Sequence, residues 1–146
     1  MSIPKYAFED VLKDYFPRWN HKGWKIRFYF NGEKTKFFPG IEYNNVSASC
    51  NRESKVIALF DEEAGINDIV RTNFIHEACH AVTRGRHNKE FFKRMMKCRL
   101  RALELGDNMI AGLIMIDMVE TKLDLKTDYD LTQLEREVKH EESTKS

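Results

Sequence analysis

The sequence has few residues that cross-link or interrupt a fold. Its 146 residues include three cysteines, three prolines and seven glycines, and no two cysteines form a CxxC pair. An odd number of widely spaced cysteines excludes a disulfide framework, and the lack of a CxxC pair excludes a zinc ribbon or a thioredoxin-like redox motif. A reducing, cytoplasmic location is the simplest expectation for such a chain.

Long apolar runs are also lacking. The longest, from Met109 to Ile116, is far shorter than the roughly 20 residues that cross a bilayer, so we expect no membrane partner. The first residues show no apolar core of a secretory signal. With 42% hydrophobic residues the chain is too apolar to stay disordered, and its length fits one domain. We expect that domain over residues 1–138 and a polar tail over residues 139–146.

Hydropathy patterning changes once along the chain. Alternating apolar residues predict strands over residues 24–30, 46–50 and 55–60, and Asn31-Gly32 predicts a hairpin with a returning strand over residues 33–38. Helical periodicity predicts helices over residues 5–16, 67–84, 88–105 and 107–123, with a further one near Leu131–Val138. The sequence therefore predicts an α+β fold, in which a small antiparallel sheet of three or four strands packs against helices.

Residues 76–80 form an HExxH motif, the one pattern in the sequence that indicates catalytic chemistry. On a helix, His76 and His80 lie one turn apart on the same face, so both imidazoles can reach one metal ion. Glu77 can then act as general base on a metal-bound water, whose pKa zinc lowers toward about 7. The motif predicts a Zn²⁺ site with Glu77 as the catalytic residue.

A catalytic zinc site needs three protein ligands and an open fourth position. His87 is the best third candidate, because it follows Gly85 at the expected start of the next helix and a tight turn can bring it back over the first. Glu90 and Glu104 are the alternatives, and a site without a third ligand stays open.

The stretch HEACHAVTRGRHNKEFFKRMMK resembles the SprT-like, or Spartan-type, zinc metalloproteases, in which a third His opens the next helix in a His-x-x-x-Phe context. The resemblance extends over about residues 46–97. It implies zinc held by His76, His80 and His87, Glu77 as catalytic base, and hydrolysis of peptide bonds, in several members within DNA-bound proteins. With three scattered cysteines, the chain resembles a short stand-alone member that lacks the zinc ribbon.

Charge is distributed unevenly. Eight Lys or Arg and one Glu lie between residues 84 and 101, a local net charge of +7. A basic helix beside the site can contact nucleic-acid phosphates, so DNA is a candidate partner, while an ordinary solvated helix face is the alternative. The candidate contact residues are Arg84, Arg86, Lys89, Lys93, Lys97 and Arg101.

Two functional classes follow from these patterns, and a third, a helical interaction protein without a metal, applies only if the HExxH motif occurs by chance. The first is a zinc metallopeptidase that acts on a protein or peptide substrate. The alternative is a non-catalytic, metal-stabilised module that binds nucleic acid or regulates a partner. Glu77 distinguishes them, because a purely structural zinc site has no use for an acid at that position and is normally closed by a fourth protein ligand.

Overall fold

The computed structural model describes residues 8–30, 48–61, 67–83 and 86–144. Their contacts divide the chain into two compact units, Met1–Val82 and Thr83–Ser146, called here the N-terminal and C-terminal units. A small sheet accompanies helices, which confirms the predicted α+β class. The single domain expected over residues 1–138 stays a prediction. Among the described residues, every helix falls short of the length and apolar character that crossing a bilayer requires.

The sheet of the N-terminal unit is mixed. Its described strands are β1 (Lys25–Phe30), β2 (Ala48–Asn51) and β3 (Val56–Asp61), in the order β1-β3-β2. β2 runs antiparallel to β3, whereas β1 runs parallel to it. The expected antiparallel sheet is therefore wrong for the β1–β3 pair. Parallel neighbours need a long crossover connection, and here the chain between β1 and β3 includes β2 itself.

A tight turn fixes the antiparallel pair. The Oδ1 atom of Asn51 accepts a hydrogen bond from the backbone N–H of Ser54 at 3.1 Å, and Lys55 takes the left-handed φ of 56° that closes the turn. The strands expected over residues 46–50 and 55–60 are thus confirmed in their described parts. The predicted hairpin at residues 31–38 lies outside the described residues.

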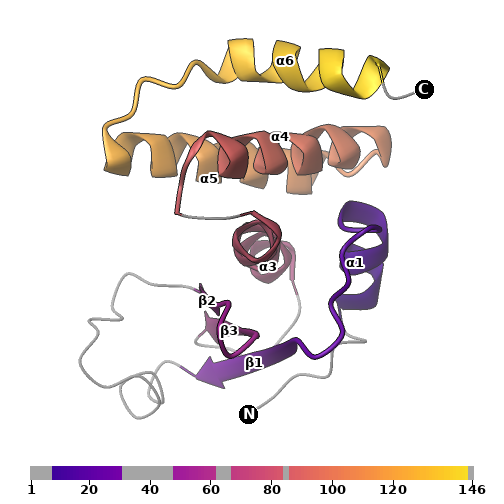
Figure 1. Cartoon of the computed structure of the whole chain (residues 1–146), viewed down its shortest axis with the longest axis vertical. Coiled ribbons are helices and arrows are strands. Elements are labelled where there is room, and N and C mark those ends of the chain that lie inside the picture. Colours follow the sequence, from indigo (N-terminus) through magenta and orange to yellow (C-terminus); the bar gives the residue numbers. More distant parts are fainter. Residues whose placement is uncertain (1–7, 31–47, 62–66, 84–85, 145–146) are drawn as a thin grey trace. The chain divides into compact units, whose positions relative to one another are not determined.

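The described part of the N-terminal unit also contains two helices, α1 (Glu9–Tyr15) and α3 (Asp68–Val82). α3 lies across the sheet, against β2 and β3 (Figure 1). The rings of Phe8, at the start of α1, and Phe74, on α3, stack with centroids 4.6 Å apart. The buried side chains of α3 include Val70, Phe74, Ile75, Ala78 and Cys79. This apolar face determines which side of α3 is left for a functional site.

The C-terminal unit contains α4 (Lys89–Glu104), α5 (Asn108–Leu125) and α6 (Leu131–Ser143). Both α5 and α6 pack on α4. The side chains of Asn88, Asp107 and Asp130 cap the three N-termini by accepting hydrogen bonds from backbone N–H groups. The Asn88 and Asp107 caps, and Gly106 with φ of 76° after α4, confirm the predicted bounds of α4 and the predicted start of α5, whereas α5 runs on to Leu125 instead of ending at residue 123.

The core of the C-terminal unit is built around α4. Its buried side chains are Phe91, Phe92, Met95, Met96, Cys98 and Ala102 on α4, Ile110, Ala111, Ile114 and Met118 on α5, and Leu134 and Val138 on α6. α6 is helical through Ser143, so the chain is still helical over most of residues 139–146, where we expect a polar tail. The reason is that Leu134 and Val138, one turn apart, anchor a helix whose outer face is polar.

Candidate metal centre

The register of α3 is set at its first turn. The Oδ1 atom of Asn67 accepts a hydrogen bond from the backbone N–H of Val70 at 2.9 Å, and an ion pair joins Asp68 to Arg71 at 3.6 Å. The helix that follows buries Phe74 and Ala78 against the unit's core. His76 and His80 are consequently turned to the half-buried side of the helix, as the periodicity predicts.

The two histidines of the HExxH motif lie together on α3. Their ring centroids are 5.1 Å apart and the ring planes are inclined by 63°. Both residues are half-buried, and the helix backbone fixes their spacing. Ile69, two turns before His76 on the same face, is 61% exposed and adds an apolar surface beside the pair.

His87 joins this pair. One nitrogen from each of His76, His80 and His87 lies within 4.8 Å of the other two, close enough for the three residues to hold a metal ion. His87 is only seven residues beyond His80, which limits how far the two can separate. Its ring packs edge-to-face on Phe91 with centroids 4.9 Å apart, and the Asn88 cap fixes the start of α4 beside it.

The alternative third ligands lie elsewhere. Glu90 and Glu104 are exposed, and Glu104 pairs with Arg101 at 3.2 Å. Within the described ranges, the only group of His, Cys, Asp and Glu side chains spaced for a metal ion is the three-histidine cluster. It contains no carboxylate and no thiolate. The donor set is therefore three imidazoles.

Three imidazoles suit zinc chemically. Nitrogen ligands about 2.1 Å from a tetrahedral ion lie about 3.4 Å from each other, so small rotations of rings already within 4.8 Å bring the nitrogens into position. Imidazole also binds copper, nickel and iron, so the donor type alone does not select the ion. Within the described residues the group has three members, so a tetrahedral ion held by them would have a fourth position for a further ligand such as water.

Glu77 lies at the edge of the histidine pair. It is 7% exposed, and its Oε1 atom is 4.0 Å from the Nε2 atom of His76. The Glu77 carboxylate also affects Cys50 on the edge strand β2. The pKa of the Cys50 thiol is raised to about 12, first by burial and then by the charge of Glu77, while Arg52 acts to lower it. Glu77 is therefore close enough to Cys50 for its charge to act on the thiol. Sequence patterns gave no signal for this proximity of Cys50, because it depends on how α3 packs on the sheet.

Comparison with known proteins finds no matching family model, curated protein or solved structure. The resemblance to the SprT-like metalloproteases stays a prediction carried by residues 76–97.

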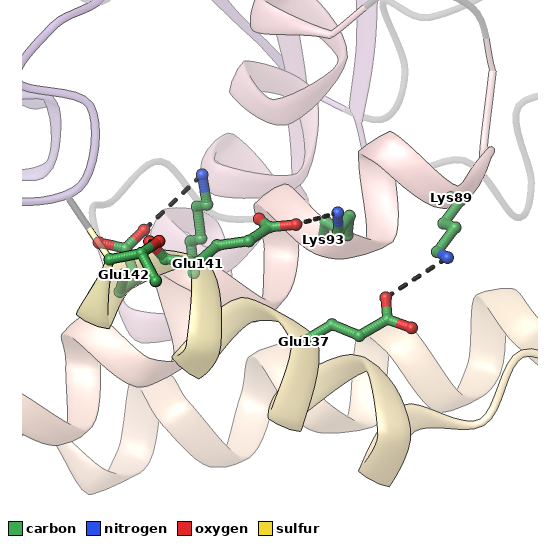
Figure 2. A network of polar contacts seen from close by, with 7 residues as sticks. Lys89, Lys93, Glu137, Glu141 and Glu142 are labelled. Carbon is green, nitrogen blue, oxygen red and sulfur yellow. Dashed lines mark hydrogen bonds and ion pairs between the residues drawn. The ribbon is translucent and has the colours of Figure 1, made fainter.

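Four of the six basic residues proposed for nucleic acid lie on α4, and all four are paired with acids. Lys89 lies 3.4 Å from Glu137 of α6, and Lys97 lies 3.7 Å from Glu142. Figure 2 shows Lys89 and Lys93 of α4 directed toward glutamates of α6. Arg101 pairs with Glu104 within α4, Arg86 is exposed, and Arg84 lies outside the described residues.

The ion pair between Arg99 of α4 and Glu135 of α6 is a further contact between these two helices that the sequence does not predict. The hydrogen bond from Arg99 lowers the pKa of Glu135 below its usual range, and the hydrogen bond to Glu141 raises the pKa of Lys93. The one signal available was spacing: Glu137 and Glu141 repeat at the same four-residue step as Lys89 and Lys93. DNA binding by this face stays a prediction, and the face is already neutralised in part by α6.

Proposed function

We propose that the protein is a zinc-dependent metallopeptidase in which His76, His80 and His87 hold the ion and Glu77 is the general base. The observation that carries the proposal is the approach of the three ring nitrogens to within 4.8 Å of one another. A buried carboxylate immediately after the first histidine adds the group that hydrolysis requires beyond metal binding. The same residues carry the resemblance to the SprT-like family.

Each side chain has a defined part in this chemistry. Zinc, when bound, supplies a Lewis acid that polarises the scissile carbonyl and makes a water molecule more acidic. Glu77 takes a proton from the attacking water, whose oxygen forms a bond to the carbonyl carbon. As the C–N bond breaks, Glu77 returns the proton to the leaving amine nitrogen. Burial of Glu77 keeps bulk solvent away from this proton.

The substrate that fits this chemistry is a peptide bond in a protein or peptide. The family resemblance extends the proposal to proteins associated with DNA, and the basic residues of α4 are the surface that such a substrate would reach. The non-catalytic alternative needs no acid beside the metal. Glu77, kept at 7% exposure next to His76, favours the enzyme.

The first experiment measures zinc per chain by elemental analysis in the purified wild type and in His87→Ala. We expect close to one zinc per wild-type chain and much less in the variant, because two imidazoles hold zinc weakly. His140→Ala is the matched control, since this exposed histidine of α6 is outside the cluster. Cleavage of an unfolded protein such as casein, inhibited by a chelator and restored by zinc, would establish the activity. A wild-type protein that takes up no zinc even after refolding with the metal would overturn the proposal.

A further inference from the structure

α5 is apolar on two opposite faces. Ile110, Ile114 and Met118 are buried where the helix packs on α4. On the other side, a row of residues in the 3-4-3-4 spacing of a helix seam is open to solvent: Met109, Gly112, Ile116, Val119 and Leu123. We call this row the α5 outer stripe. Met109 is 61%, Ile116 55% and Leu123 68% exposed.

Such clustering is unusual for a surface. Seven of the eight large exposed hydrophobic side chains of the described chain lie between residues 103 and 125, on α5 and at the adjoining end of α4. Leu103, near the end of α4, is among them at 44% exposure. A contiguous apolar patch on a folded domain marks an interaction site far more often than scattered apolar residues do.

We propose that the α5 outer stripe is a homodimer interface in which two copies of the chain pair antiparallel about Ile116. The spacing of the stripe is that of the a and d positions of a coiled coil. Met109 and Leu123 lie seven residues on either side of Ile116. A two-fold axis through Ile116 therefore places Met109 of one copy beside Leu123 of the other, so these three apolar positions of the stripe pair with one another across the axis.

Charge selects the antiparallel arrangement. The first half of α5, from Asn108 to Ile116, carries no charged side chain, whereas the second half carries three carboxylates and one ammonium group, a net charge of −2. A parallel pair would place two acidic halves side by side. In the antiparallel pair, each acidic half lies along the uncharged half of the other copy, near its positive helix N-terminus.

Gly112 allows the close approach that such a pair needs. A Cβ atom added at this glycine would meet no atom within 4 Å, so the backbone there is open. In the register set by Ile116, it lies opposite Glu120 of the second copy, whose side chain can pass over the glycine to solvent. The Glu120 side chains of the two copies are about 12 Å apart along the helices, so they do not collide.

The expected interface is small. An 18-residue helix is about 27 Å long, and a pair of that length falls at the low end of specific interfaces, below about 1,200 Å² in total. We therefore expect a dimer that dissociates on dilution. The stretch from Met109 to Met118 is then half core and half contact, which accounts for its hydrophobicity around the whole circumference.

Sedimentation velocity of the full chain, between about 1 and 200 µM, tests the dimer. We expect the wild type to shift from monomer toward dimer with concentration, and Ile116→Glu and Leu123→Glu to stay monomeric. Ile69→Glu, the same kind of change at a side chain of equal exposure on α3, is the matched control and should dimerise like the wild type. Circular dichroism of each variant establishes that it is folded. A wild type that is monomeric throughout, or a dimer that Ile116→Glu leaves intact, would overturn the proposal.

Disulfide formation tests the orientation. Ile116→Cys should cross-link to itself, because the residue lies on the two-fold axis. Met109→Cys and Leu123→Cys should cross-link when mixed and not alone, because like positions are about 21 Å apart in the antiparallel pair. Wild type and Lys139→Cys, an exposed position on α6, give the background. Cross-linking of each single variant with itself and not of the mixture would show a parallel dimer and contradict the stated arrangement. These outcomes do not depend on zinc or on peptidase activity.

Discussion

The Oε1 atom of Glu77 lies 4.0 Å from the Nε2 atom of His76, and the glutamate is buried on α3, the helix that packs against β2 and β3. This places a carboxylate beside the candidate metal centre without making it a member of the three-histidine group. In the proposed function, metal binding and proton transfer therefore belong to different side chains. Each can be removed without removing the other.

Glu77→Gln should retain zinc and lose hydrolysis. The amide has nearly the shape of the carboxylate but cannot take a proton from water, and a positioned general base contributes about 10²- to 10⁴-fold to the rate. Elemental analysis and a peptide-cleavage assay on the same sample measure the two properties. Glu90→Gln, an exposed acid of α4, is the control. Full activity in Glu77→Gln would show that another group is the base.

Phe74→Ala should destabilise the N-terminal unit by about 3–5 kcal/mol. The side chain is fully buried and stacks on Phe8, so truncation leaves a cavity and removes a ring contact. Chemical denaturation monitored by tryptophan fluorescence measures the change. Ile69→Ala, an exposed change on the same helix, should stay within about 0.5 kcal/mol of the wild type. Equal effects of the two substitutions would contradict the described packing of α3.

Local signals in the sequence locate most of the described elements, because caps and glycines act within one turn. Asn88, Asp107 and Gly106 each satisfy or end a helix terminus, and each is visible in the sequence. Strand pairing is different. The parallel register joins Lys25 to Val56, which are far apart in the chain, and no local pattern encodes that direction.

The residues of the candidate site also divide into those that a local sequence pattern predicts and those that depend on how distant segments pack. The HExxH spacing locates His76, Glu77 and His80 because a helix places them by geometry alone. His87 was a candidate from its position after a glycine, and the structure brings its ring to the pair. The basic residues Lys89 and Lys93 can be identified from the sequence. Their acidic partners cannot, because these partners depend on where α6 packs.

Cys50 should make the protein less stable at high pH. Burial and the nearby Glu77 raise the pKa of Cys50 to about 12, whereas an unfolded chain has a cysteine pKa of about 8.5. The folded protein therefore keeps this proton over a range in which the unfolded chain loses it. The contribution is fully present below about pH 8.5 and is lost as the pH rises toward about 12. Denaturation of wild type and Cys50→Ser between these values isolates the effect. Parallel pH profiles would contradict the assignment.

Glu135 should contribute stability with the opposite dependence on pH. Its pKa is lowered by the hydrogen bond from Arg99, so the folded protein binds this proton less readily than the unfolded chain. The contribution is present above the ordinary glutamate pKa of about 4.3 and is lost as the pH falls through the lower folded value. We expect Glu135→Gln to cost about 0.5–1 kcal/mol at pH 7, and less in high salt. Glu53→Gln, an exposed change in the β2–β3 turn, should show neither effect.

Duplex DNA should compete with α6 for the lysines of α4. Lys89, Lys93 and Lys97 already pair with carboxylates of α6, so phosphates can reach them only by displacing those acids. Replacing Glu137, Glu141 and Glu142 together by Gln should therefore strengthen DNA binding. It should also steepen the salt dependence by about 2–3 units in the slope of log K against log salt, one for each phosphate gained.

Fluorescence anisotropy with a labelled duplex at several salt concentrations measures both the affinity and its salt dependence. Asp128→Asn, an exposed acid in the α5–α6 connection, should leave them unchanged. If the triple variant binds DNA no better than the wild type, the lysines of α4 serve to hold α6 through ion pairs, and α4 is not a nucleic-acid surface.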